Sequence, residues 1–330
     1  MTMNDFSEIK GHAQIIGSLK ESMEKGRVSH AYIFSGKKGS GRKTMANAFA
    51  KAMQCEAGCG KACGKCASCR SFDSKNNPDV YYVYPTKTKA LSVDDVREQI
   101  IERVKTKQYR CRYKIFIVDN AETMTQQAQN ALLKTLEEPP EYVVIMLIAE
   151  NMKSILPTVL SRCVELKFMP LKNDDVKEYL SEKQGLSQTD AAFFAEYSMG
   201  SIGRAVQLSQ DEDFANMRRD LYEKLSAITR MSVSSVMTLG ASFEKYKGYS
   251  EFLEMIFMWY RDIYTAKRFK SDKYIIQKDM KEDIMALAEH YSFESLERIT
   301  DAIKRTEELL SFNTNFQLAM EMLFMEIKEN

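Results

Sequence analysis

The first half of the chain alternates short apolar runs with longer amphipathic stretches. Four of the runs are rich in β-branched and aromatic residues: AYIFS at 31–35, VYYVY at 80–84, KIFIVD at 114–119 and VVIMLIA at 143–149. They lack the alternation of a half-exposed strand, which is typical of parallel strands that helices cover on both faces. We therefore predict an α/β fold, a parallel sheet with flanking helices.

Helix signals fill the gaps between these runs. Ser92 can cap a helix, and Asp95 stands three residues later, where it can complete the cap. A second helix should cover about 126–138 and stop before Pro139 and Pro140, because the residue before a proline disfavours the helical conformation. This alternation of strands and helices favours the parallel sheet.

After Pro170 the pattern is helical to the end of the chain. Helices predicted at 174–183 and 188–197 form a small group that we interpret as a separate lid. From about 211 the helices are longer, and we expect their apolar stripes to form an intramolecular bundle core, although twenty methionines leave room for adaptable subunit contacts. The stripe of the last helix consists of Phe316, Met320, Leu323, Phe324 and Ile327.

Composition narrows the class of protein. The 330 residues are 44% hydrophobic, which suffices for two or three packed domains. With 47 basic and 46 acidic side chains, no global electric field drives the chain onto nucleic acid or a membrane. No apolar stretch has membrane-spanning length, and the segment MTMNDFSEIK lacks the apolar core of a secretory signal, so we expect a cytoplasmic protein.

A glycine-rich loop, GKKGSGRKT, follows the first predicted strand and precedes the helix-forming run MANAFAKAM. In this setting backbone N–H groups converge on a phosphate, and the following helix adds its positive end. The candidate nucleotide-binding residues are Gly36, Gly39, Ser40, Gly41, Arg42, Lys43 and Thr44. A standard phosphate loop has lysine and then a hydroxyl where Arg42 and Lys43 stand, so magnesium lacks its usual hydroxyl ligand. The sequence leaves open whether ATP or ADP binds.

A second departure lies at the end of the KIFIVD run. Asp119 is placed like the aspartate that helps to hold magnesium in P-loop ATPases, but Asn120 follows it. A carboxylate at the second position would polarise the attacking water, and an amide cannot act as a base. Both departures argue against ATP hydrolysis by this chain.

Five of the seven cysteines fall within CEAGCGKACGKCASC at 55–69, a spacing that suits a metal in a reducing compartment. Four thiolates around one ion form a closed, structural zinc site. The natural set is Cys55, Cys63, Cys66 and Cys69. Cys59 competes with Cys55 for the fourth position, and an iron–sulfur cluster is the second choice. Cys111 and Cys163 are expected to be ordinary buried thiols.

Five motifs follow one another along the chain: HAYIFSG at 30–36, the glycine-rich loop, the cysteine cluster, NALLKTLEEPP at 130–140 and LSRC at 160–163. In this order they resemble the bacterial clamp-loader subunits of DNA polymerase III. The resemblance implies an AAA+ core of the P-loop NTPase type with a zinc-binding insertion at about 55–69. It places this core at 1–168, a helical lid at 169–208 and an all-α collar domain at 209–330.

Within that family the gamma/tau subunits keep the lysine of the phosphate loop and an Asp-Glu pair that delta-prime subunits often lack. Arg42 and Asn120 therefore favour the delta-prime type. The arginine of the Ser-Arg-Cys motif, Arg162 here, would act as an arginine finger in the ATP site of a neighbour. The resemblance implies a non-enzymatic stator, assembled with gamma/tau and delta subunits, that reaches the sliding clamp and primer-template DNA mainly through the assembly.

Two other functions stay open. A gamma-like ATPase would use Glu122 in place of the missing carboxylate, although Glu122 stands three residues past Asp119. A freestanding zinc-dependent nucleic-acid binder would use the modest set of basic residues near the cysteines, Lys61, Lys65 and Arg70.

Overall fold

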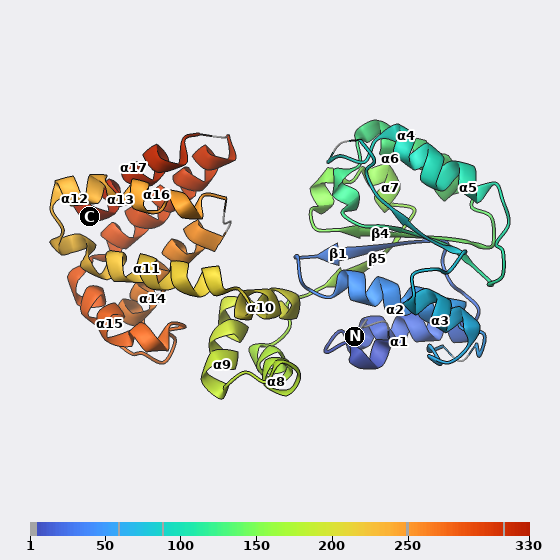
Figure 1. Cartoon of the computed structure of the whole chain (residues 1–330), viewed down its shortest axis with the longest axis horizontal. Coiled ribbons are helices and arrows are strands. Elements are labelled where there is room, and N and C mark those ends of the chain that lie inside the picture. Colours follow the sequence, from blue (N-terminus) through green and yellow to red (C-terminus); the bar gives the residue numbers. More distant parts are fainter. Residues whose placement is uncertain (1–4, 59, 88, 249–250, 313) are drawn as a thin grey trace. The chain divides into compact units, whose positions relative to one another are not determined.

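The computed structural model describes residues 5–58, 60–87, 89–248, 251–312 and 314–330. The chain divides into two compact units, one that extends to Val206 and one over Gln207–Asn330 (Figure 1). The first unit is built on a sheet and the second is helical. Among the helices of the described residues, none is both long enough and apolar enough to cross a membrane.

Five parallel strands form the sheet, in the order β2-β3-β4-β1-β5. They are β1 (Ala31–Gly36), β2 (Val80–Val83), β3 (Lys114–Val118), β4 (Val143–Ala149) and β5 (Val164–Phe168). The four strands predicted from apolar runs are confirmed. The fifth, β5, was missed because it lies at an edge of the sheet, where only Leu166 and Phe168 of VELKF are buried.

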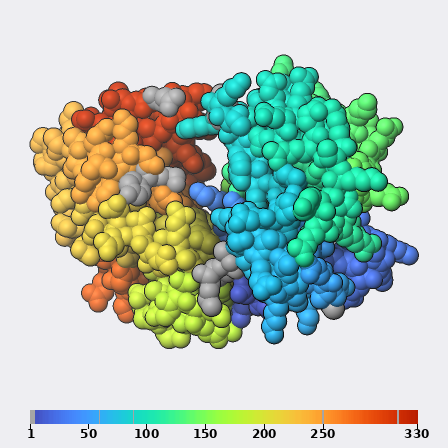
Figure 2. All heavy atoms as spheres, turned by 45° about the vertical axis from the view of Figure 1, so that its right-hand side comes forward, coloured from blue at the N-terminus to red at the C-terminus, as the bar shows by residue number. Residues whose placement is uncertain are grey.

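Helices cover both faces of this sheet (Figure 1). One face carries α1 (Ala13–Glu24), α2 (Arg42–Gln54) and α3 (Ala67–Asp73), and the other carries α4 (Val93–Val96), α5 (Glu102–Val104), α6 (Gln126–Glu137) and α7 (Pro157–Leu160). The short helical segments are η1 (Phe6–Glu8), η2 (Arg97–Ile101), η3 (Ala121–Thr123) and η4 (Met152–Ser154). In Figure 2 the light-blue to cyan part of the chain, the cysteine insertion and the helices after it, forms much of the visible surface of this unit.

The central strands bury side chains on both faces. Phe34 and Ile117 belong to the core that contains α2, whereas Ile33 and Phe116 belong to the core that contains α6. Successive residues of a strand point to opposite faces, so a strand between two layers of helices must be apolar at every position. This confirms the α/β fold predicted from the runs.

The predicted helix signals are also confirmed. The Ser92 hydroxyl accepts a hydrogen bond from the Asp95 N–H (3.2 Å), and the Asp95 carboxylate accepts one from the Ser92 N–H (2.9 Å), which completes the capping box. Helix α6 ends at Glu137, before Pro139 and Pro140.

Three helices follow the sheet: α8 (Asn173–Gln184), α9 (Gln188–Tyr197) and α10 (Ile202–Ser209). Within the first unit they have a small core of their own, made of Val176, Leu180, Ala191, Ala195 and Ala205. The helices at 174–183 and 188–197 are confirmed, while the domain boundaries at 168 and 208 stay a prediction.

The second unit is a helical bundle. Its helices are α11 (Glu212–Ala227), α12 (Val233–Met237), α13 (Leu239–Ser242), α14 (Glu251–Phe269), α15 (Lys281–His290), α16 (Phe293–Ser311) and α17 (Phe316–Glu329), with the short segments η5 (Ile228–Arg230), η6 (Glu244–Tyr246) and η7 (Lys278–Met280). The predicted stripe of α17 is buried against α12, α13 and α16, which confirms an intramolecular core. Leu318 and Met322, on the other side of α17, are exposed.

The bundle contains its own spectroscopic reporter, because Trp259 is the single tryptophan, is fully buried and stacks on Tyr222 at 4.8 Å. Replacing the buried Phe324 by Ala should lower the free energy of unfolding of this unit by about 3–5 kcal/mol, because it leaves a cavity. Met322→Ala, on the exposed side of the same helix, should change it by at most about 0.5 kcal/mol. Urea denaturation followed by tryptophan fluorescence measures both, and equal midpoints would contradict this packing.

Candidate functional site

The glycine-rich loop connects the carboxyl end of β1 to the first residue of α2. Gly39 (φ +76°) and Gly41 (φ +91°) have left-handed backbone conformations, which favour glycine. Helix α2 then begins at Arg42. The Met45 N–H donates a hydrogen bond to the Gly41 carbonyl (2.9 Å). The N–H groups of the first turn thus have no partner within the helix, as an anion site requires.

A cavity of about 530 Å³ lies beside this loop. Its lining comes from the N-terminal segment, the loop, the end of β3 and β4, and the helices after the sheet: Glu8, Ile9, Lys10, His12, Lys38, Gly39, Ser40, Gly41, Arg42, Lys43, Thr44, Asp119, Asn120, Ile148, Leu171, Tyr179, Ile202, Gly203 and Val206. The structure therefore brings together the predicted loop residues with Asp119, apart from Gly36, which is the last residue of β1. A cavity of this size fits a small-molecule ligand.

Lys43 forms an ion pair with Asp119, with 2.7 Å between Nζ and Oδ2. The pairing follows from the fold, because the loop after β1 and the residue after β3 meet at the carboxyl edge of the sheet. An ammonium group thus neutralises the aspartate that would otherwise help to hold a divalent cation. Sequence reasoning noted the missing hydroxyl at 43 but did not foresee this pair.

Arg42 is buried, with 9% of its surface exposed. Burial lowers the pKa of its guanidinium, and the nearby carboxylates of Glu150, Glu122 and Asp119 oppose that change. A buried cation therefore stands at the first residue of α2, with three carboxylates close enough to act on its charge.

Further contacts of the loop were not predicted. The imidazole Nε2 of His12 lies 3.2 Å from the Ser40 carbonyl oxygen, and burial lowers the pKa of His12. Glu150 accepts a hydrogen bond from the Lys38 N–H (3.2 Å). Glu150 directly follows β4, and this position at the carboxyl end of a strand could have indicated that Glu150 belongs to the site. No local sequence pattern indicated that His12 does.

The start of α10 packs directly on the loop. The Gly203 N–H donates to the Gly39 carbonyl (2.9 Å), and the Ser201 hydroxyl donates to the Lys38 carbonyl (3.1 Å). A Cβ on Gly39 would lie 2.7 Å from the Arg204 nitrogen, and one on Gly203 would lie 2.8 Å from the Gly39 Cα. Both glycines therefore permit close approach of two backbones.

Arg162 follows α7, immediately before Cys163 and β5. Its guanidinium forms an ion pair with Glu137 (Nη2 to Oε1, 2.6 Å) and donates to the Thr158 carbonyl (2.8 Å). The side chain keeps 34% of its surface exposed. One ion pair thus joins the Ser-Arg-Cys motif to the LEEPP motif. In the sequence these two motifs were treated as separate.

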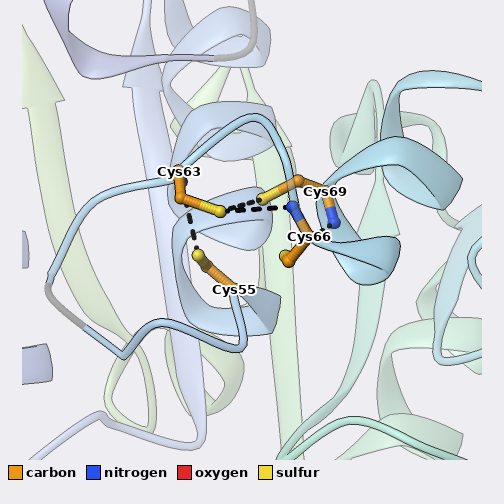
Figure 3. Close-up of side chains that lie close together, drawn as sticks. All are labelled: Cys55, Cys63, Cys66 and Cys69. Atoms are coloured by element: carbon orange, nitrogen blue, oxygen red, sulfur yellow. Dashed lines mark hydrogen bonds between the residues drawn. The ribbon is translucent and has the colours of Figure 1, made fainter.

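The sulfur atoms of Cys55, Cys63, Cys66 and Cys69 all lie within 4.8 Å of one another (Figure 3). Cys55 caps the end of α2, and Cys66 caps the start of α3. Backbone N–H groups of Lys65 and Cys66 donate to the Cys63 sulfur, and they lower the pKa of that thiol to about 6. These four cysteines can hold a metal ion.

The remaining cysteines have different settings. Cys59, the alternative fourth ligand, lies outside the described residues. Cys111 and Cys163 are half-buried, so the expectation that both are buried thiols was wrong. Cys111 lies near the surface beside the Ser68 hydroxyl (3.0 Å), and burial raises the pKa of Cys163 to about 12.

The parallel sheet with its loop, the flanking helices and the helical C-terminal region define an AAA+ type protein of the P-loop NTPase class. Residues 11–172 match the family described as "DNA polymerase III, delta subunit". Residues 212–329 match the family described as "DNA polymerase III, delta subunit, C terminal". The chain belongs to the delta' family of DNA polymerase III clamp-loader subunits.

Named relatives show how far the similarity extends. DNA polymerase III subunit delta' of Bacillus subtilis (strain 168) is 32% identical over 321 residues, 96% of each chain. Subunit tau of Escherichia coli (strain K12) is 29% identical over 211 residues, 62% of this chain and 32% of that protein. The crystal structure of a gamma subunit-related protein from Thermotoga maritima has 21% identity and a TM-score of 0.42, over 95% of this chain and 98% of that one.

Replacing Gly39 by Ala should separate the loop from α10, because the new Cβ meets the Arg204 backbone and φ is positive. We expect a loss of about 1–3 kcal/mol in stability and faster hydrogen exchange at 200–206, both measurable on the full chain. Gly41→Ala is the matched control, since its φ is also positive but its Cβ would meet nothing within 4 Å. Equal exchange in the two variants would contradict the contact.

The cysteine cluster should bind about one zinc ion per chain, measured by metal analysis of the purified protein. Cys69→Ser should reduce the bound zinc strongly and lower the melting temperature, because it removes a buried ligand. Cys111→Ser, outside the cluster, should leave the zinc content unchanged. Full zinc occupancy in the Cys69 variant would contradict the ligand set.

Proposed function

We propose that this clamp-loader subunit is an ATPase-deficient stator that provides geometry and an arginine finger to its assembly. The observation that carries the proposal is the ion pair between Lys43 and Asp119. It occupies the aspartate that magnesium would need, and Asn120 offers no base at the next position. Without a free ligand for the metal and a base for the water, the site would keep the structure of an ATPase site but would not hydrolyse ATP.

Arg162 is the residue that would act in a neighbouring subunit. It stands in the Ser-Arg-Cys motif, a third of its side chain is exposed, and the ion pair with Glu137 holds the guanidinium at the surface. A positioned guanidinium stabilises the charge that develops on a transferred phosphoryl group. Glu137 is in this proposal a positioning residue.

The partners would be gamma/tau and delta subunits, together with which the chain would load the sliding clamp onto primer-template DNA. Similarity to both delta' and tau proteins supports these partners. A structural zinc ion in the cysteine cluster would tie the end of α2 to the start of α3, because Cys55 and Cys66 cap these helices.

The gamma-like ATPase is the second function considered, and the geometry does not favour it. Asp119 and Asn120 line the cavity, whereas Glu122 is not among the lining residues in the described part of the chain. The alternative base therefore does not line the cavity in which a nucleotide would sit.

Reconstitution with cognate gamma/tau and delta subunits tests the proposal. We expect Arg162→Ala to lower the DNA-stimulated ATPase of the assembly by about twofold or more without preventing assembly, because one of its ATP sites loses a finger. The isolated wild-type chain should show no turnover above background.

Arg97→Ala is the control, since this arginine is exposed and pairs only weakly with Asp94 (3.9 Å). Size-exclusion chromatography establishes that each variant assembles. Unchanged ATPase in the Arg162 variant would remove the finger, and brisk turnover by the isolated chain that disappears in Asp119→Ala would support the enzyme instead.

A further inference from the structure

The helical bundle carries a group of exposed aromatic rings where α14 ends beside α15 (Figure 1). Tyr264 contacts Phe293, the first residue of α16, with 5.3 Å between the ring centroids. Phe269, the last residue of α14, contacts Tyr274 with 4.8 Å between the centroids. Each of the four residues is at least 38% exposed. Neighbouring exposed rings of this kind mark a binding surface, whereas single exposed apolar residues are ordinary.

The two pairs of rings lie along one side of α14. Arg268 stands four residues after Tyr264, so their side chains leave the helix on the same side. Arg261, one turn before Tyr264, donates a hydrogen bond to the Tyr274 carbonyl (3.2 Å). This bond brings the segment after α14 to the side of the helix that carries Tyr264 and Arg268. The rings and the arginines therefore belong to one continuous surface.

Basic side chains stand among the rings. The Lys267 ammonium lies 5.4 Å from the centroid of the Phe293 ring, and the Lys273 ammonium lies 5.3 Å from that of Tyr274. Arg268 and Lys270 are exposed, and neither forms an ion pair within the described residues. We call this surface the aromatic–basic strip, which consists of Tyr264, Lys267, Arg268, Phe269, Lys270, Lys273, Tyr274 and Phe293.

The acidic neighbours of the strip leave its positive charge in excess. Asp272, within the segment after α14, faces Lys281 with 4.0 Å between Oδ2 and Nζ. Asp262 is fully buried and forms an ion pair with Arg261 (2.6 Å). Glu289 and Glu294 stand at the end of α15 and the start of α16, beside the Phe293 end of the strip. The positive end is therefore the one that carries Phe269 and Tyr274.

A buried carboxylate fixes the segment that carries Tyr274. The Asp262 carboxylate accepts hydrogen bonds from the Ile276 N–H (3.0 Å) and the Gln277 N–H (2.9 Å). Ile275, next to Tyr274, is fully buried. The exposed ring thus precedes three residues that are anchored in the bundle. A ring held in place before binding loses little conformational entropy when a ligand stacks on it.

The chemistry of the strip favours one kind of partner. Proteins that bind single-stranded nucleic acid combine basic side chains that follow the phosphates with aromatic rings on which bases stack. The cores of protein–protein interfaces are also rich in aromatic residues, but they are depleted in lysine. Three lysines, Lys267, Lys270 and Lys273, stand among the rings of the strip. A protein partner is therefore less well matched than a nucleic acid.

We propose that the aromatic–basic strip binds single-stranded nucleic acid, with bases stacked on the free faces of Phe269 and Tyr274. Arg268, Lys270 and Lys273 bind its phosphates. The binding is local to the strip, so the balance of 47 basic and 46 acidic side chains over the whole chain does not oppose it. The proposal concerns the helical unit alone and does not depend on the stator role. It gives the chain a direct contact with a single strand, in addition to any contact made through the assembly.

Fluorescence anisotropy of a labelled oligodeoxythymidylate, titrated with the full chain, tests the proposal. We expect saturable binding that weakens about tenfold or more between about 50 mM and about 200 mM salt, because about three phosphates release their counterions. A DNA duplex of the same length should bind about fivefold more weakly, since its paired bases cannot stack on the rings.

Variants of the strip locate the binding. Phe269→Ala and Tyr274→Ala should each weaken it by about fivefold or more, because each removes a stacking surface. Phe269→Tyr keeps a ring and should restore the affinity to within about twofold of the wild type. Arg268→Ala should reduce the slope of log affinity against log salt by about 0.7, which the loss of a purely structural arginine would not do.

Phe312→Ala is the matched control for the rings, because Phe312 is 82% exposed and follows the last residue of α16. The 19 residues of α16 place it about 28 Å along the helix from Phe293. Lys304→Ala removes an exposed cation of the same helix outside the strip. Both controls should bind the oligonucleotide within about twofold of the wild type, and circular dichroism establishes that each variant is folded.

Two results would overturn the proposal. One is wild-type affinity in both Phe269→Ala and Tyr274→Ala, and if these variants also failed to assemble with gamma/tau and delta subunits, the strip would be a protein contact instead. The other is that the unmodified chain fails to bind the oligonucleotide at low salt, or binds the duplex as tightly as the single strand. The second result needs no variant, so it is decisive even if a substitution prevents folding.

Discussion

The first unit depends on one constraint, the burial of both faces of its central strands. Ile33 and Phe34 are neighbours in β1, but they belong to the cores on opposite faces of the sheet. A shift of β1 by one residue would exchange the two faces, so only one register places both side chains in their cores. This register brings the carboxyl ends of β1, β3 and β4 to one edge of the sheet. The glycine-rich loop, Asp119 and Glu150 meet at this edge because each of them directly follows one of these three strands.

Much of the fold could be predicted from the sequence because its signals are local. Apolar runs gave four strands, and the capping box at Ser92 and the prolines after α6 gave helix ends. The edge strand β5 escaped because it is buried on one side only at Leu166 and Phe168. A strand of this kind has the composition of a polar loop and becomes recognisable only when its neighbour is known.

The candidate site was predicted in its residues but not in its contacts. The loop, the aspartate and four cysteines were all named from spacing. The structure places the loop residues other than Gly36 around one cavity with Asp119 and groups the four cysteines, while the roles of these residues stay predictions. The pair between Lys43 and Asp119 joins residues 76 positions apart, and the pair between Arg162 and Glu137 joins residues 25 apart. Such contacts depend on the order of strands and on side-chain direction, which no local pattern contains. From the sequence, residue 43 was noted only for lacking the hydroxyl that would bind magnesium. In the structure the Lys43 ammonium forms a specific ion pair with Asp119.

Helix α2 has a fixed point at each end. Its first residue lies in the glycine-rich loop, and its last turn leads into Cys55, the first of the clustered thiols. Thirteen residues of helix span about 20 Å, so the two sites are the ends of one rigid rod. A displacement of Cys55 at one end of α2 would therefore reach Arg42 and Lys43 at the other end through the helix itself, with no ligand shared between the two sites.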